Sequence, residues 1–263
     1  MSGKNVLITG AARGLGREIA LSYAEAGASG IALLDLLDCS AVEPALLKAA
    51  KTSGRSPPNV IRLQLDITKL AEVEGAVQTV KTKFGTLDIL INNAGYLNPY
   101  TPLGDSDPEL WWRAWEVNVK GVYLMTRCFL PLVLDSRDKT IVVMSSVGAH
   151  HTIPGGSSYE TTKLAVLKVN NYLMEEYGSR GLLVYAVAPG GVNTDMANGF
   201  PAESMHLLTD TPRLVADTMT FLTAERREWL AARYVDSRWD MSELVARKED
   251  VVKNNLLKVQ MRV

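Results

Sequence analysis

Tyr159 and Lys163 are four residues apart in a stretch with helical character, and Ser146 stands thirteen residues before the tyrosine. Residues i and i+4 of a helix lie on one face, so the two side chains can point into the same small volume. An ammonium beside a phenol lowers the phenol pKa from its usual value of about 10. The pair predicts a tyrosine that acts as general acid or base, with a serine hydroxyl hydrogen-bonded to a substrate oxygen. The same spacing also occurs by chance in many helices.

A glycine-rich turn follows the first apolar run of the chain, residues 5–9, and leads into a helical pattern. A strand, a tight turn and a helix N-terminus form an anion site, where glycines allow close approach of a pyrophosphate. The spacing differs from the commoner G-x-G-x-x-G, and a plain strand-to-helix turn is the alternative. The turn contains Gly10, Arg13, Gly14, Leu15 and Gly16.

Short apolar runs alternate with amphipathic patterns along the chain, and this alternation predicts an α/β fold. We expect a three-layer, doubly wound parallel sheet of Rossmann-like type, in one domain spanning residues 1–263. The expected strands are 5–9, 30–36, 60–65, 87–91, 141–144, 182–187 and 231–235, and the expected helices include 70–84, 109–134, 159–177 and 211–222. A charged tail, 244–263, should be helical at first.

Polar residues stand at the carboxyl ends of the expected strands, where parallel sheets of this kind bind ligands. Asp35 ends the second run and predicts an acceptor for ribose hydroxyls; the alternatives are a helix cap, or Asp38 in the same role. Asp66 and Asn92 end the third and fourth runs, and Ser146 follows the fifth. This coincidence predicts one binding site along that edge of the sheet.

Composition limits the class of protein. The chain has 263 residues with a formal net charge of -1, which gives no electrostatic reason to expect a nucleic-acid or anionic membrane partner. No uninterrupted apolar run approaches the roughly eighteen residues of a membrane span, and no signal-peptide pattern opens the chain. Cys39 and Cys128 are expected to be packed thiols, and no metal site is predicted. We expect a cytoplasmic protein.

The motifs, in this order, resemble those of the short-chain dehydrogenases/reductases over about residues 5–240. Residues 9–16 are similar to the family's T-G-x-x-x-G-x-G, residues 92–95 to its N-N-A-G, and residues 159–163 to its Y-x-x-x-K. Ser146 has the family's serine-to-tyrosine spacing, whereas Ser145 is one residue off. Pro189-Gly190 followed by Thr194 resembles its nicotinamide-contacting motif.

The resemblance implies a proton exchange between Tyr159 and substrate, with Lys163 lowering the tyrosine pKa and binding the nicotinamide ribose. Ser146 would orient the substrate oxygen, and Asn118, mid-way in an expected helix, would hold a water; the alternatives for Asn118 are an exposed side chain or a helix kink. The residues assigned to the cofactor are Gly10, Arg13, Gly14, Leu15, Gly16, Asp35, Asp66, Ile67, Asn93, Ala94, Gly95, Tyr159, Lys163, Pro189, Gly190, Val192 and Thr194.

The implied reaction is an NAD(P)-dependent interconversion of a secondary alcohol and a ketone. A net-neutral reaction on the same fold, such as epimerisation or dehydration, and a nucleotide-sensing binding protein are the alternatives. NAD is the expected cofactor, because the Asp35 carboxylate would repel the 2′-phosphate of NADP. Arg13 favours the opposite choice, but Leu36 is not the arginine that NADP-users often carry there.

A small and fairly apolar substrate is expected, since a predicted lid over residues 195–212 is rich in methionine and leucine. His150 and His151 either contact substrate or face solvent or another subunit. The helices around 112–130 and 159–177 carry more apolar residues than one buried face needs. Family members pair these helices across a two-fold axis, which implies a homodimer or homotetramer. The Gly-Gly-Val sequence after Pro189 and the stretch with Arg-Tyr-Val at 233–235 and Trp-Asp-Met at 239–241 resemble members of the family from filamentous fungi. Many of those members act in specialised metabolism.

Overall fold

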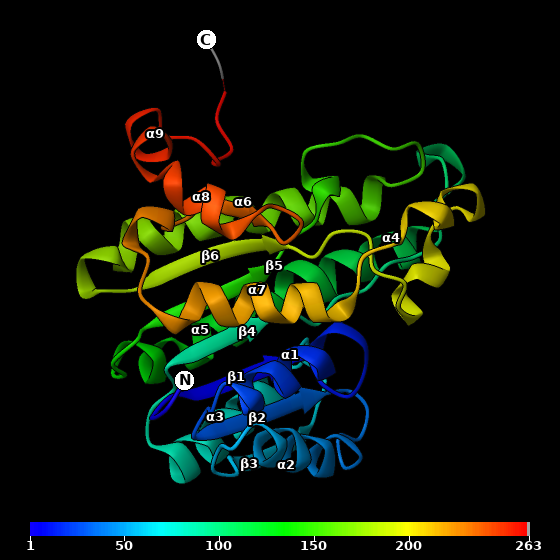
Figure 1. Cartoon of the computed structure of the whole chain (residues 1–263). Helices are drawn as coiled ribbons and strands as arrows, with labels where there is room; N and C mark the ends of the chain where they lie inside the picture. Colours follow the sequence, from blue (N-terminus) through cyan, green and yellow to red (C-terminus); the bar gives the residue numbers. More distant parts are fainter. Residues whose placement is uncertain (262–263) are drawn as a thin grey trace.

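A seven-stranded sheet of order β3-β2-β1-β4-β5-β6-β7 forms the centre of the computed structural model, which describes residues 1–261 (Figure 1). Every neighbouring pair of strands is parallel. The strands are β1 (Asn5–Thr9), β2 (Gly30–Asp35), β3 (Asn59–Gln64), β4 (Ile89–Asn92), β5 (Thr140–Met144), β6 (Leu183–Ala188) and β7 (Tyr234–Asp236). The strand order reverses between β1 and β4, so the predicted doubly wound α/β fold is confirmed.

Helices cover both faces of this sheet (Figure 1). One face packs against α1 (Gly14–Glu25), α2 (Val42–Thr52) and α7 (Pro212–Ala224), and the other against α3 (Leu70–Phe84), α5 (Val122–Leu134) and α6 (Ser157–Tyr177). Residues of β1 alternate between these two cores: Ile8 belongs to the first and Leu7 to the second, and both are fully buried. This double burial explains why the strands are near-continuous apolar runs in the sequence.

Where the structure differs from the predicted elements, local backbone geometry supplies the reason. The single helix expected over 109–134 consists of α4 (Pro108–Trp115), a π-helical turn η2 (Glu116–Gly121) and α5. Asp107 caps α4, and its side chain accepts the backbone amides of Glu109 and Leu110. The helix α2 was not predicted.

The segment expected as a lid contains two short 3₁₀ helices, η5 (Asp195–Gly199) and η6 (Ala202–Leu207). The remaining short turns are η1 (Leu103–Asp105), η3 (Val147–Ala149), η4 (Gly178–Arg180) and η7 (Glu228–Leu230). The tail begins with α8 (Met241–Ala246) and α9 (Lys248–Lys253), as expected, and Leu257 packs against the first core. The end of the predicted tail, 262–263, lies outside the described residues.

One helical stretch, Pro108–Leu134, is by length and composition long and apolar enough to cross a membrane, because it contains an 18-residue window with a mean hydropathy of 1.3. Lys120 and Arg127 interrupt its apolar residues, so the stretch is not an uninterrupted apolar run in the sequence. In the fold, 61% of the apolar window is buried, and Met125 and Phe129 are fully enclosed. The stretch therefore has the character of a core helix that lies against the sheet.

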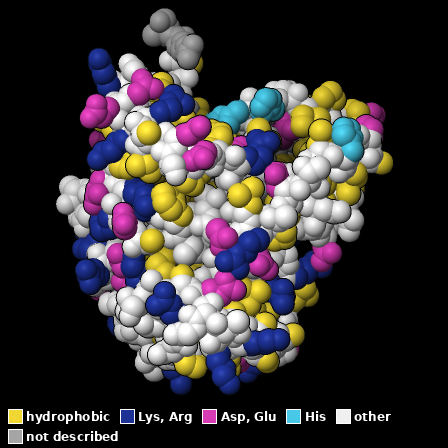
Figure 2. Space-filling view, in the orientation of Figure 1, with side chains coloured by type: hydrophobic (Ala, Val, Ile, Leu, Met, Phe, Trp, Pro, Cys, Tyr) yellow, Lys and Arg dark blue, Asp and Glu magenta, His cyan; other side chains and the backbone are white. Residues whose placement is uncertain are grey.

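Basic and acidic side chains are interspersed over the face shown in Figure 2.

Candidate active site

The glycine turn between β1 and α1 is shaped for close approach of a ligand. Gly10 has a φ of +69°, and a Cβ at this position would lie 3.0 Å from the Ala94 Cα. A Cβ at Gly16 would overlap the carbonyl oxygen of Gly10. The first turn of α1 carries no acidic residue and no side-chain cap, so its amides face outward with the positive end of the helix dipole. This cradle fits the pyrophosphate of a dinucleotide.

Asp35 lies at the carboxyl end of β2 and is held by two backbone amides. Its Oδ2 accepts from Ala12 N at 2.8 Å, and its Oδ1 accepts from Leu37 N at 2.9 Å. These bonds join the end of β2 to the glycine turn and fix the carboxylate. Asp38 instead accepts bonds from Ser40, two residues on. The geometry therefore favours Asp35 over Asp38 as the acceptor for ribose hydroxyls.

The loops after β3 and β4 line the same edge. Asp66 accepts the backbone amide and the hydroxyl of Thr68, at 2.9 and 2.8 Å, which fixes its carboxylate. Asn93 donates its side-chain amide to the Thr9 carbonyl at 2.8 Å. The Thr9 hydroxyl in turn accepts the backbone amides of Asn93 and Ala94, both at 3.0 Å. The end of β1 and the loop after β4 are thus locked together.

Asn118 is fully buried at the centre of the π-helical turn, so the exposed alternative is excluded. Its Oδ1 accepts from Tyr96 N at 2.8 Å, and its Nδ2 donates to the Tyr96 carbonyl at 2.9 Å and to Thr162 Oγ1 at 3.1 Å. A Cβ at Gly95 would lie 3.3 Å from Asn118 Oδ1 and 3.7 Å from Lys163 Nζ. The structure therefore brings Asn118 and Lys163 to the same point of the loop after β4.

The two serines after β5 have different environments. Ser145 is fully buried, and its hydroxyl donates to the Lys163 carbonyl at 3.1 Å. Ser146 is partly exposed; its Oγ accepts from Gly148 N at 3.1 Å, and its hydroxyl is near enough to Tyr159 to act against the rise of the phenol pKa. Ser145 is therefore bonded to the backbone of α6, whereas the hydroxyls of Ser146 and Tyr159 lie near each other. This arrangement agrees with the assignment of Ser146, rather than Ser145, to the site.

Lys163 is 4% exposed, and its Nζ donates to the Met144 carbonyl at 2.9 Å while lying 5.4 Å from the centroid of the Tyr159 ring. Burial lowers the Lys163 pKa to about 8. Burial also raises the Tyr159 pKa to about 12, against an opposing hydrogen bond from Ser146. The predicted lowering of the Tyr159 pKa is wrong for this arrangement, because desolvation is the largest cause of the shift and Lys163 is not among the groups that oppose it.

The loop after β6 crosses toward the glycine turn. The Asp210 carboxylate accepts the backbone amide of Gly191 at 2.8 Å and so fixes the loop that contains Pro189, Gly190 and Val192. Asp210 was not among the site residues predicted from the sequence. The Thr194 methyl carbon would lie 3.6 Å from a Cβ at Gly14. Thr194 is thereby placed beside the glycine turn.

Three further side chains near the site, those of Glu160, Tyr100 and Phe200, were missed. Glu160 is buried, and its Oε2 accepts Ile153 N at 3.1 Å. The Tyr100 ring meets Phe200 edge to face, with centroids 5.2 Å apart. Only the glutamate, directly after Tyr159, could have been noticed in the sequence.

His150 and His151 are both exposed. The His150 ring lies edge-on to Tyr234 with centroids 4.6 Å apart, and partial desolvation, together with the neighbouring His151, lowers the His150 pKa. Over residues 1–261, no three His, Cys, Asp or Glu side chains cluster so as to hold a metal ion. Cys39 is buried and Cys128 half-buried, both as free thiols.

Comparison with known proteins agrees with this geometry. Residues 4–204 match the family model of the short chain dehydrogenases. The chain is 46% identical to the short chain dehydrogenase mpl6 of Monascus purpureus over 259 residues, which cover 98% of this chain and 89% of the relative.

Two solved structures show the same fold with different cofactors. A 3-ketoacyl-(acyl-carrier-protein) reductase from Brucella melitensis, complexed with NADH, is 28% identical with a TM-score of 0.78, covering 89% of this chain and 96% of that one. A short chain dehydrogenase from Shigella flexneri, complexed with NADP, is 26% identical with a TM-score of 0.79, covering 91% and 98%. With its matching residues, its fold and its fungal relatives, the chain belongs to the short-chain dehydrogenase family.

Proposed function

We propose that the protein is an NAD-dependent oxidoreductase that interconverts a secondary alcohol and a ketone. The observation that carries this proposal is the juxtaposition of Ser146, Tyr159 and Lys163 at the sheet edge that also holds the glycine turn. A nucleotide sensor would not need a hydroxyl pair and a buried amine assembled at this point, whereas a net-neutral enzyme could use the same groups and differs only in its net change of NADH. Bound at the glycine turn, the dinucleotide supplies the hydride chemistry.

We infer a reduction of a ketone, in which each residue of the site has a definite role. A tyrosine with a raised pKa is protonated at neutral pH, so Tyr159 is prepared to donate its proton to a carbonyl oxygen. Ser146 would hold the same oxygen through its hydroxyl and stabilise the developing charge. Lys163, bonded to Met144 here, would hold the ribose of the cofactor through its ammonium. Asn118 fixes the loop around Gly95, and the proposed water relay would begin there.

NAD is the proposed cofactor because of how Asp35 is held. Each of its oxygens already accepts a backbone amide, so the carboxylate cannot turn away from a ligand at the end of β2. Ribose hydroxyls can donate to the remaining lone pairs, whereas a 2′-phosphate would meet a fixed like charge. The known structures hold either NADH or NADP, so the preference rests on this local geometry.

The proposed substrate is a small, fairly apolar ketone. Phe200 and Met196 belong to the lid, and Met196 Cε would lie 3.4 Å from a Cβ at Gly95. Tyr100, from the loop after β4, packs on Phe200. These side chains supply the apolar surface that we propose for the substrate. A role in fungal specialised metabolism, in the cytoplasm, completes the proposal.

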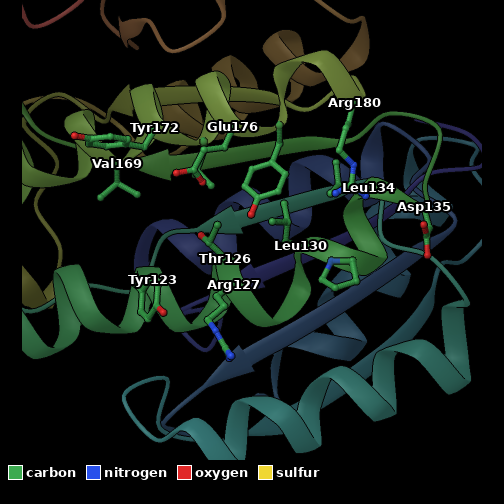
Figure 3. Close-up of a pocket in the computed structure, with 13 residues that line it drawn as sticks. Tyr123, Thr126, Arg127, Leu130, Leu134, Asp135, Val169, Tyr172, Glu176 and Arg180 are labelled. Carbon is green, nitrogen blue, oxygen red and sulfur yellow. The ribbon is translucent and has the colours of Figure 1, made fainter.

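A homodimer or homotetramer built on α5 and α6 is proposed as the assembled form. A groove of about 650 Å³ lies between these helices and is lined by Tyr123, Leu130, Tyr172 and Arg180, among others (Figure 3). Tyr123 and Tyr172 are 53% and 59% exposed. Apolar surface of this kind on two adjacent helices fits a self-complementary contact.

Absorbance at 340 nm tests the proposed reaction. The purified protein is mixed with NADH and a panel of small apolar ketones, and NADH binding is followed separately by tryptophan fluorescence. The proposal predicts loss of absorbance with at least one ketone. NADH binding without turnover across the panel would favour a sensor, whereas conversion of a substrate without net change in NADH would favour a net-neutral enzyme.

A further inference from the structure

Arg13, in the glycine turn, lies close to the expected binding position of the adenosine ribose, and the structure shows it in an ion pair. The preceding residue, Ala12, donates its backbone amide to the Asp35 carboxylate, so the backbone of Arg13 lies near Asp35. Its guanidinium nevertheless donates to Asp195 Oδ2 at 2.6 Å. Asp35, whose two oxygens accept the amides of Ala12 and Leu37, is not the carboxylate that the Arg13 guanidinium contacts.

Asp195 is held in position by the residues on either side of it. The Thr194 methyl carbon would lie 3.6 Å from a Cβ at Gly14, and Met196 Cε would lie 3.4 Å from one at Gly95. Asp195 opens η5, where Thr194 O accepts Ala197 N at 2.8 Å. The carboxylate therefore stands beside the glycine turn, 182 residues away in the sequence from its partner.

We propose that Asp195 is a cofactor-specificity residue, which withholds Arg13 from the 2′-phosphate of NADP by pairing with it. This inference rests on the proposed nicotinamide cofactor. Two carboxylates then act against NADP in different ways: Asp35 repels the phosphate directly, whereas Asp195 removes a nearby cation that would attract it. A guanidinium freed from Asp195 could form a charge-assisted hydrogen bond with the phosphate.

The size of the effect follows from the exposure of the pair. Both side chains are well exposed, at 62% and 63%. Such pairs contribute at most about 1 kcal/mol, which corresponds to about fivefold in a binding constant. Salt screens exposed charges, so the effect should shrink as ionic strength rises.

The test compares two probes that lack the nicotinamide, adenosine 2′,5′-bisphosphate and 5′-AMP. Their dissociation constants are measured by calorimetry for the unmodified protein and for Asp195→Asn. We expect Asp195→Asn to improve the ratio in favour of the bisphosphate about fivefold at low salt. Arg13→Gln in the Asp195→Asn background should abolish the gain, and about 0.5 M NaCl should reduce it.

A matched control removes a carboxylate from another exposed pair. Asp250 pairs with Arg247 at 3.2 Å in the tail, and Asp250→Asn makes the same change in net charge. Its ratio should stay at the unmodified value. A change below about twofold in Asp195→Asn, or a gain that persists without Arg13, would overturn the inference. A preference of the unmodified protein for NADP would refute the proposed cofactor instead, and would leave the comparison between variants interpretable.

Discussion

Two hydrogen bonds join the side-chain amide of Asn118 to the backbone of Tyr96, which both donates and accepts. Tyr96 N donates to Asn118 Oδ1 at 2.8 Å, and Asn118 Nδ2 donates to the Tyr96 carbonyl at 2.9 Å. The π-helical turn carries Asn118 inward, where an uninterrupted α-helix would place its side chain differently. Through this contact the loop after β4 lies beside Lys163, whose Nζ would be 3.7 Å from a Cβ at Gly95.

The close approach at the glycine turn predicts unequal outcomes for two alanine substitutions. Gly16→Ala should weaken NADH binding at least about tenfold, because the new methyl would force the turn away from the helix N-terminus. Gly75, inside α3, has open space where an alanine methyl would stand, with nothing within 4 Å of that position. Gly75→Ala should keep NADH binding and stabilise the protein by about 0.5–1 kcal/mol.

Fluorescence titration with NADH and thermal unfolding, on both variants, check this prediction. Equal NADH affinity in folded Gly16→Ala and Gly75→Ala proteins would show that the turn is not the pyrophosphate site.

Asp35→Ser should shift the cofactor preference toward NADP. The substitution removes the fixed carboxylate and leaves a hydroxyl that can still bond the ribose, so we expect the NADP-to-NAD ratio of kcat/KM to rise at least about tenfold. Asp38→Ser is the control, since Asp38 is exposed and bonded to Ser40. If the two variants shift the ratio equally, Asp35 has no special position. An unmodified protein that uses NADP better than NAD would also contradict this account.

A charge placed between α5 and α6 should dissociate the assembly. Tyr172→Glu puts a carboxylate on the exposed surface of the groove that Tyr123 also lines, and burying it in an interface would cost several kcal/mol. Light scattering at micromolar concentration should give a monomer for this variant and a dimer or tetramer for the unmodified protein. Leu47→Glu, on the opposite side of the sheet in α2, should keep the assembly. A monomeric unmodified protein would refute the proposed interface.

The buried amine predicts the pH dependence of ketone reduction. Burial lowers the Lys163 pKa to about 8. Nearly all Lys163 side chains are therefore charged well below this pH, and the charged fraction falls as the pH rises through it. Tyr159, with its pKa raised to about 12, stays protonated across the same range. We therefore expect kcat/KM for reduction to be constant below about pH 7 and to fall above about pH 8. A rate that stays constant to about pH 10 would show that the charge on Lys163 is not required.

The elements that follow from local patterns were predictable, and those that depend on distant contacts were not. Apolar runs that end in Asp35 and Asp66 indicated the strands and their carboxyl ends, because strands buried on both faces leave that pattern in any sequence. The π-helical turn at Asn118 was not predicted; the Asn118 side chain that it carries is bonded to Tyr96 and Thr162, which are distant in the sequence.

The electrostatic details also depend on the fold. The sequence spacing of Tyr159 and Lys163 predicts that the two side chains are close but not that they are buried. Burial raises the Tyr159 pKa and lowers the Lys163 pKa, so it favours the uncharged form of each. The pairing of Arg13 with Asp195 joins residues far apart in the chain. No periodicity records such a contact, so the state of Arg13 could be obtained only from the three-dimensional structure.

The turnover of Tyr159→Phe tests the central claim most directly. The substitution removes one hydroxyl and keeps the ring, so the protein should fold and bind NADH as before. With a ketone that the unmodified protein reduces, we expect kcat to fall at least about a hundredfold, because the proton donor is lost. Circular dichroism and NADH titration establish that the variant is intact. A folded, NADH-binding Tyr159→Phe protein that retains kcat within about tenfold of the unmodified value would contradict the account.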